Sequence, residues 1–315
     1  MQVQGARGSM RAHHIAPSPL PSKHGAEQAG AYTAVQYMPV LNITEKQARS
    51  LASGTYGRAS LEHIASFGVP FFIVRRGTIS ARNLDSTRNL LPNGTAFVVN
   101  LGQGPFGVTA NHVVEAALAA TVEKVGLFPK RFEPPALPLV EMPDFEKRII
   151  VRDAERDIAT FRVTSDEVAA LRVSILSAPP MVPTEGTGGV AFVGYPGTQR
   201  DLVTVQRGPD GPEMTLSWAV FPGFGVAASV SDRQVTFQFD VSELTSAPPG
   251  FRHPDPNLDL GGMSGGPMLV KCETQSGIEY WAPAAVITQG EMRDDLNGGL
   301  LFASRLDSLR ADGRI

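Results

Sequence analysis

The sequence predicts an all-β protein with a partly helical, partly disordered N-terminal extension. After about residue 65, short runs of β-branched and aromatic residues are separated by Gly, Pro, Asn and Asp, which is typical of antiparallel strands joined by turns. A hydrophobic content of 42% is sufficient for one large core or two medium ones. The strand-like runs lie at 71–74, 96–99, 148–151, 190–193 and 235–239.

The two ends of the chain have a different character. Residues 1–40 are rich in Pro, Gly, Ala, Ser and His without periodicity, which predicts a flexible leader. Good helix formers recur over 44–64 between glycines, which predicts one or two short helices. Near the C-terminus, Leu306 and Leu309 stand among charged residues over 303–311, a spacing that predicts a short amphipathic helix.

Charge and composition exclude several classes of protein. The formal net charge is −3, from 28 basic and 31 acidic residues, so no electrostatic feature favours nucleic acid as a partner. The single cysteine, Cys272, cannot form an intrachain disulfide. No apolar run approaches the roughly 18 to 20 residues of a membrane span, and residues 1–30 lack a signal-peptide core. We therefore expect a cytoplasmic protein without a membrane span; its oligomeric state does not follow from the sequence.

One serine stands in an unusual setting, the segment Gly-Gly-Met-Ser-Gly-Gly-Pro at 261–267. Small residues let the backbone turn sharply and bring two N–H groups close to a substrate carbonyl. Ser264 is therefore a candidate nucleophile, and the N–H groups of Gly262 and Ser264 form a candidate oxyanion hole. On this motif alone, a merely structural tight loop remains an alternative.

A serine hydroxyl needs a histidine to accept its proton and a carboxylate to hold that histidine in the right tautomer. The other histidines lie in the leader, before the strands or in a proline-rich loop, which leaves His112 in Thr-Ala-Asn-His-Val. Asp157 opens the strand-like run Asp-Ile-Ala-Thr-Phe. Taken singly, His112 could be structural and Asp157 could be a turn former.

Taken together, the three motifs resemble those of the trypsin-like, chymotrypsin-fold serine peptidases of bacterial type, and they occur in that family's order. Two further stretches, 193–197 and 286–290, resemble a turn and the substrate-binding strand of that family. The resemblance covers roughly residues 68–310. It implies two packed antiparallel β-barrels, one over 65–178 and one over 179–315, with residues 1–64 outside them.

The resemblance also implies a function. The chain would be an endopeptidase in which Ser264 attacks a protein or peptide substrate, His112 shuttles the proton and Asp157 orients the imidazole. It would need neither a metal nor an organic cofactor. Two alternatives stay open: a peptide-binding or scaffold module that has lost catalysis, and an esterase that uses the same residues.

Substrate-binding residues follow from the same resemblance. Thr288, Gln289 and Gly290 would pair with the substrate backbone, and the Thr288 hydroxyl could reach a buried Asp157; an ordinary strand running into a turn is the alternative. Leu258 stands where the family sets its specificity, which would favour an apolar or small residue at the cleavage position. If the adjacent Asp259 faces the pocket instead, Lys or Arg would be preferred.

The sequence also departs from the family at one position. Animal digestive members carry an aspartate before the nucleophile, which pairs with a new N-terminus after cleavage, whereas this chain has Met263. That ion pair cannot form here. The nucleophile loop would then be formed at synthesis, or ordered by partner binding or by removal of the leader.

Overall fold

The computed structural model of the chain describes most of the sequence after residue 54. The predicted leader at 1–40 lies outside the described residues, as do Leu258 and Asp259. One of the predicted short helices is confirmed as helix α2 (Thr55–Ala65). The described residues are 55–75, 93–119, 122–129, 139–186, 189–197, 200–208, 211–218, 220–240, 260–293 and 298–315.

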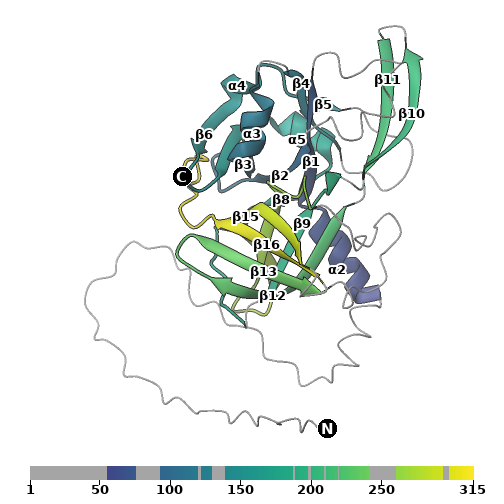
Figure 1. Ribbon diagram of the computed structural model, residues 1–315. Coiled ribbons are helices and arrows are strands. Elements are labelled where there is room, and N and C mark those ends of the chain that lie inside the picture. Colours follow the sequence, from purple (N-terminus) through teal and green to yellow (C-terminus); the bar gives the residue numbers. More distant parts are fainter. Residues whose placement is uncertain are drawn as a thin grey trace, which may run out of the picture. The chain divides into compact units, whose positions relative to one another are not determined.

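The first β unit is an open sheet with the strand order β5-β4-β1-β2-β3-β7-β6 (Figure 1). All neighbours on this path pair antiparallel, and β8 adds a short parallel pairing to β2. Short helices α3, α4 and α5 lie between its strands. The bounds are β1 Gly68–Arg75, β2 Asn93–Val99, β3 Phe106–Ala110, α3 Asn111–Ala117, β4 Val122–Leu127, β5 Val140–Glu141, α4 Phe145–Arg148, β6 Ile149–Asp153, β7 Ile158–Arg162, α5 Ser165–Leu171 and β8 Ile175–Leu176.

The second β unit is a closed antiparallel barrel with the order β12-β13-β16-β15-β14-β9. Its interior is filled by phenylalanines that meet edge to face, among them Phe192, Phe221 and Phe237. A separate hairpin, β10–β11, follows β9 in the chain. The bounds are β9 Gly189–Gly194, β10 Arg200–Gly208, β11 Gly211–Trp218, β12 Phe221–Val230, β13 Gln234–Asp240, β14 Pro267–Glu273, β15 Glu279–Arg293 and β16 Gly298–Arg305.

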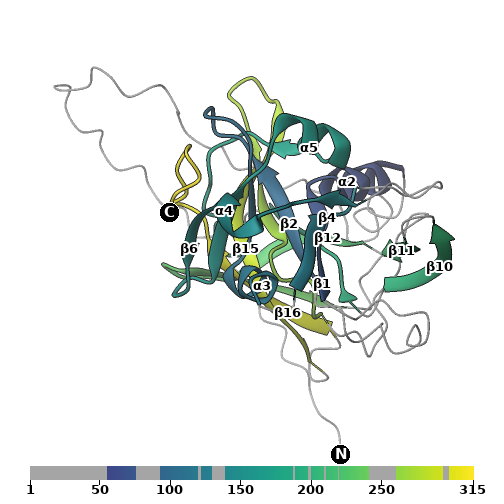
Figure 2. The ribbon, with the colours of Figure 1, turned by 90° about the horizontal axis from the view of Figure 1, so that it is seen from above.

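Alternation along each strand decides which side chains enter which core. In β1, Phe71 and Ile73 face the main core of the first sheet, while Phe72 and Val74 pack against a smaller cluster on the other face. The main core also takes in Val193 of β9, so the barrel packs against the sheet (Figures 1 and 2). The prediction of an all-β protein with two packed antiparallel β units is confirmed. Both units were expected to be barrels; the second is a closed barrel, whereas the first is an open sheet.

The predicted C-terminal helix is wrong. Residues up to Arg305 continue as strand β16, which pairs with both β13 and β15, and the residues after it form turns. Leu306 and Leu309 are buried as the spacing suggested, but in a single turn in which the Leu309 N–H donates to the Leu306 carbonyl at 2.8 Å. Two flanking strands bind the β16 backbone, so local helix propensity is overridden. Within the described residues, no helix is both long and apolar enough to cross a bilayer.

Candidate active site

Ser264 lies in a tight loop, residues 260–266, that leads into β14. Gly262 and Gly265 in this loop have φ values of +95° and +89°. This left-handed region carries no steric cost for glycine and a substantial one for other residues. The small residues around Ser264 are therefore required by the backbone conformation.

Met263, immediately before Ser264, anchors the loop in the barrel. Its side chain is fully buried in the barrel core. It packs so closely on Gly194 of β9 that a Cβ added there would lie 2.6 Å from the Met263 sulfur. Apolar burial thus holds the loop at the position where the sequence lacks a pairing aspartate.

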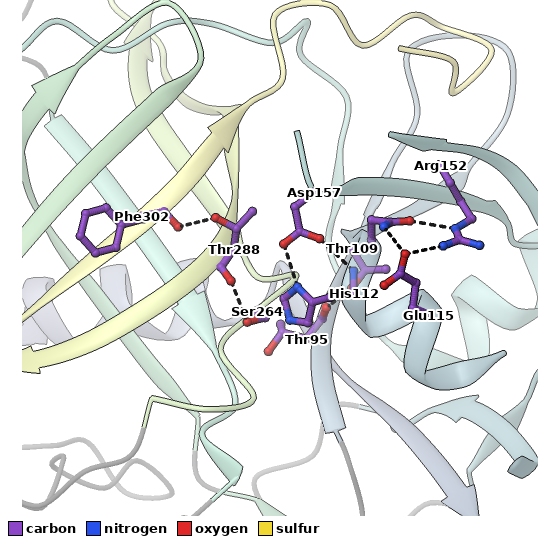
Figure 3. A network of polar contacts seen from close by, with 10 residues as sticks. Thr95, Thr109, His112, Glu115, Arg152, Asp157, Ser264, Thr288 and Phe302 are labelled. Carbon is purple, nitrogen blue, oxygen red and sulfur yellow. Dashed lines mark hydrogen bonds and ion pairs between the residues drawn. The ribbon is translucent and has the colours of Figure 1, made fainter. Parts of the chain in front are cut away.

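His112 and Asp157 come together because their strands are neighbours. Strands β3 and β7 pair with Ala110 opposite Ile158, so the residues that flank this pair meet at one end of the sheet. The Asp157 carboxylate accepts from the His112 backbone N–H at 2.8 Å and lies 2.7 Å from the His112 Nδ1 (Figure 3). The N–H of Asn111 donates to the Asp157 carbonyl at 3.1 Å, which fixes the acid's own backbone.

The surroundings of His112 favour its protonated form. The hydrogen bond to Asp157 raises the pKa of the imidazole above its ordinary value of 6.5; partial burial opposes this, and the charges of Asp157 and Glu115 add to it. Arg152 holds Glu115 at 2.8 Å and also donates to the Asn111 side-chain oxygen at 2.8 Å. The imidazole side chain is 48% exposed, so it remains accessible to a substrate.

Strand β2 holds the Ser264 loop beside α3. The N–H of Thr95 donates to the Ser264 carbonyl at 2.8 Å. A Cβ added at Gly94 would lie 3.2 Å from the same carbonyl oxygen and 2.7 Å from the side chain of Val113. Because Val113 follows His112 in the chain, the loop and the histidine meet across the junction of the two β units.

The two hydroxyl groups of the site point to backbone carbonyls. Ser264 Oγ donates to the Thr288 carbonyl at 3.2 Å (Figure 3). The side chains of Ser264 and His112, both among the described residues, are not hydrogen-bonded to each other. The expected hydrogen bond from Thr288 to Asp157 is not formed. The Thr288 hydroxyl donates to the Phe302 carbonyl at 3.2 Å, and the Asp157 side chain is 28% exposed rather than buried.

The N–H groups of Gly262 and Ser264 have no acceptor among the described residues. The carbonyl of Gly261 accepts from the Gly197 N–H at 2.6 Å. Because C=O and N–H point in opposite directions in a trans peptide, this contact turns the Gly262 N–H away from Gly197. The loop thus presents two unpaired donors next to the serine.

No protein-family model and no curated protein sequence matches the chain. Among solved structures, it is similar to the protease Anisep from Arthrobacter nicotinovorans at 12% identity, covering 77% of this chain and 91% of that one with a TM-score of 0.42. It is similar to the serine protease domain of the Sesbania mosaic virus polyprotein at 14% identity, covering 78% and 92% with a TM-score of 0.37. A Glu endopeptidase is 13% identical, with coverage of 77% and 85% and a TM-score of 0.39.

The strand order and the barrel closure decide the architecture: an antiparallel open sheet packed against a closed antiparallel barrel. The chain has a chymotrypsin-like fold. The chemistry of the candidate site rests on the geometry described above.

In this chymotrypsin-like fold, part of strand β15, which follows the serine in the chain, pairs with another strand on one side only. Strand β15 pairs with β14 only as far as Val286, opposite Pro267, and continues against β16 alone. Among the described residues, Thr288, Gln289 and Gly290 therefore have no neighbouring strand on the side of the Ser264 loop.

The surroundings of Gly290, on the side where a Cβ would point, are apolar. A Cβ added at Gly290 would lie 2.6 Å from the Cβ of Leu260 and 3.2 Å from a methyl group of Leu301. Both leucines are buried in the barrel core. The competing candidates for specificity, Leu258 and Asp259, lie outside the described residues, so their orientation remains a prediction.

Sequence reasoning missed the polar residues that support the site. Thr95 and Thr109 are fully buried; Thr95 is hydrogen-bonded to the Ser264 loop, and Thr109 is hydrogen-bonded to Thr95. Asn111 and Arg152 brace the start of α3. A threonine within an otherwise apolar strand run, as Thr95 precedes 96–99, is the signal that could have identified the first of them.

Proposed function

We propose that the chain is a trypsin-like serine endopeptidase with His112, Asp157 and Ser264 as its catalytic triad. The observation that carries this proposal is the double contact of Asp157 with the backbone and the ring of His112. It holds the Nδ1 of the ring as the protonated nitrogen, which leaves Nε2 free to accept a proton.

The reaction would proceed in two stages. Ser264 Oγ attacks the scissile carbonyl carbon while its proton passes to His112 Nε2, and the C–N bond then breaks as that proton passes to the leaving amine. Water, deprotonated by the same nitrogen, then attacks the acyl carbon; the bond from this carbon to Ser264 Oγ breaks, the proton returns from His112 to Oγ, and the acid is released. The N–H groups of Gly262 and Ser264 would stabilise the oxyanion in both stages.

The present contact of Ser264 with Thr288 is compatible with this role. The hydroxyl turns about a single torsion, χ1, so a change of rotamer redirects it without backbone movement. Hydrogen bonds between nucleophile and base are often absent in free enzymes and form when substrate binds. The backbone hydrogen bonds of the loop that carries Ser264 support this proposal, since no rebuilding of the loop would be needed.

A peptide suits the site better than a small ester. An extended peptide can add a strand beside residues 288–290 of β15, which lack a partner on that side among the described residues. We further propose that the apolar surroundings of Gly290, formed by Leu260 and Leu301, favour a small or apolar residue at the cleavage position. Turnover of a peptide library and of matched activated esters would test both proposals.

Labelling with a fluorophosphonate probe tests the triad directly, because such probes react with serines activated by a base. The wild type should be labelled, whereas Ser264→Ala and His112→Ala should not. Ser276→Ala is a matched control, since Ser276 lies exposed in the turn between β14 and β15. Absence of labelling in folded wild-type protein would contradict the proposal and favour a peptide-binding module.

A further inference from the structure

Thr95, in strand β2 of the first sheet, is hydrogen-bonded to the nucleophile loop through both its backbone and its side chain. Its backbone N–H donates to the Ser264 carbonyl at 2.8 Å, and its hydroxyl donates to the Gly262 carbonyl at 2.8 Å. The same hydroxyl accepts from the Tyr195 N–H at 3.0 Å. Thr95 is fully buried, so water does not compete for these contacts.

A second threonine holds Thr95 itself. The Thr109 hydroxyl donates to the Thr95 carbonyl at 2.7 Å, and Thr109 is also fully buried. Gly265 lies so close to this pair that a Cβ added there would collide with the Thr95 carbonyl oxygen and the Thr109 hydroxyl. Thr95 is therefore fixed at its N–H, its carbonyl and its side chain.

Between Gly261 and Gly265 the loop has four successive peptide groups, and the carbonyl of each is bound. The Gly261 carbonyl accepts from Gly197 at 2.6 Å and the Met263 carbonyl from Gly266 at 2.9 Å. These two peptide groups carry the unpaired N–H groups of Gly262 and Ser264, which point away from the bound carbonyls.

Thr95 binds the other two of these four peptide groups, through the carbonyls of Gly262 and Ser264. A peptide group turns only through changes in φ and ψ at the two α-carbons that it shares with its neighbours, so bound neighbours limit how far it can turn. Thr95 therefore restrains the peptide groups that flank both unpaired donors.

We propose that Thr95 is a positioning residue that holds the Gly262 and Ser264 N–H groups in their oxyanion-binding orientation. This inference rests on the proposed peptidase function. It assigns the alignment of the oxyanion hole, which lies in the barrel, to a side chain of the first sheet, and it makes the loop's conformation independent of any ion pair at position 263.

The test compares Thr95→Val with Thr95→Ser. Valine keeps the shape of threonine but removes the hydroxyl, and with it the hydrogen bonds to the Gly262 carbonyl and from the Tyr195 N–H. Serine keeps the hydroxyl. Thr160→Val is the matched control, because Thr160 is fully buried in β7 and its hydroxyl donates to the Gly313 carbonyl at 2.6 Å, away from the loop.

Activity is the first readout. Thr95→Val should lower kcat and the fluorophosphonate labelling rate by about 10- to 100-fold with little change in KM, because a misaligned oxyanion hole weakens transition-state binding alone. The pH dependence should not shift, since the His112 pair is untouched. Thr95→Ser and Thr160→Val should keep most of the wild-type rate per folded molecule.

Amide hydrogen exchange of the 260–266 segment is the second readout and needs no activity. Thr95→Val should speed exchange in this segment, whereas Thr160→Val should not. Unchanged exchange and kcat in Thr95→Val, or equal losses in Thr160→Val, would overturn the inference. If the wild type neither cleaves peptides nor is labelled, the proposed function fails, while the exchange comparison still decides whether Thr95 holds the loop.

Discussion

His112 is the titratable residue whose protonation should govern activity. Only the neutral imidazole can accept the proton of Ser264, so the labelling rate should rise with pH as His112 loses its proton. Because Asp157 and Glu115 raise the pKa of His112, the midpoint of this rise should lie above pH 6.5. Glu115→Gln removes one of the negative charges and should move the midpoint to lower pH.

The pH profile of fluorophosphonate labelling checks this prediction. Glu146→Gln, an exposed substitution on α4, is the control and should leave the midpoint in place. A Glu115→Gln profile that coincides with the wild type would show that the charge of Glu115 does not reach the imidazole. A midpoint below pH 6.5 in the wild type would show that burial outweighs the contact with Asp157 in setting the pKa of His112.

At the scale of the element, the nucleophile loop depends on the absence of a side chain at Gly265. Alanine at this position would be strained by the positive φ and would also collide with Thr95 and Thr109. We expect Gly265→Ala to lower the free energy of unfolding by about 3 kcal/mol and to abolish labelling. Urea denaturation and probe labelling of the same sample would measure both effects.

Gly104 provides the control for that experiment. Its φ is +103°, yet nothing lies within 4 Å of a Cβ added there. Gly104→Ala should therefore cost only the backbone strain, roughly 1 kcal/mol, and leave labelling unchanged. Equal destabilisation in the two variants would show that the contact with the first sheet does not constrain the loop.

The sequence predicted elements where local pattern and tertiary packing agree. The runs at 71–74, 96–99, 190–193 and 235–239 all lie within strands, because short runs rich in β-branched and aromatic residues suit strands with covered faces. The segment Leu306–Leu309 failed this test, since its spacing fits a helix while the preceding backbone is bound by two strands. The His112–Asp157 contact followed from motifs, and their meeting depends on the pairing of β3 with β7.

Other parts of the site could not be read from the sequence. The role of Thr95 depends on contacts with Gly262 and Ser264, far away in the chain, and no local pattern specifies such a pairing. The Thr288 hydroxyl was expected to reach Asp157, but a bulge between Ile287 and Gln289 alters the register there. Irregularities of this kind arise from the fit between strands and are decided by packing.

At the scale of the whole molecule, the C-terminal segment joins the two β units. It leaves the barrel at β16 and then buries Leu306 and Leu309 in the core of the first sheet. The Thr160 hydroxyl donates to the Gly313 carbonyl near the end of the chain, and Arg156 donates to Ser308. Arg156 precedes β7 and Thr160 lies within it, so the segment binds the first sheet where β7 begins.

This arrangement predicts that the tail contributes to global stability. Leu309→Ala should lower the free energy of unfolding by about 3 kcal/mol, since the leucine is only 6% exposed and its removal leaves a cavity in the shared core. Asp312→Asn on the same tail should cost less than about 0.5 kcal/mol, because its ion pairs with Arg310 and Arg314 are surface contacts at 3.7 Å. Urea denaturation followed by tryptophan fluorescence would measure both values. If Leu309→Ala unfolds at the wild-type urea concentration, the tail is not part of the cooperative core, and the two β units are held together by their direct contact alone.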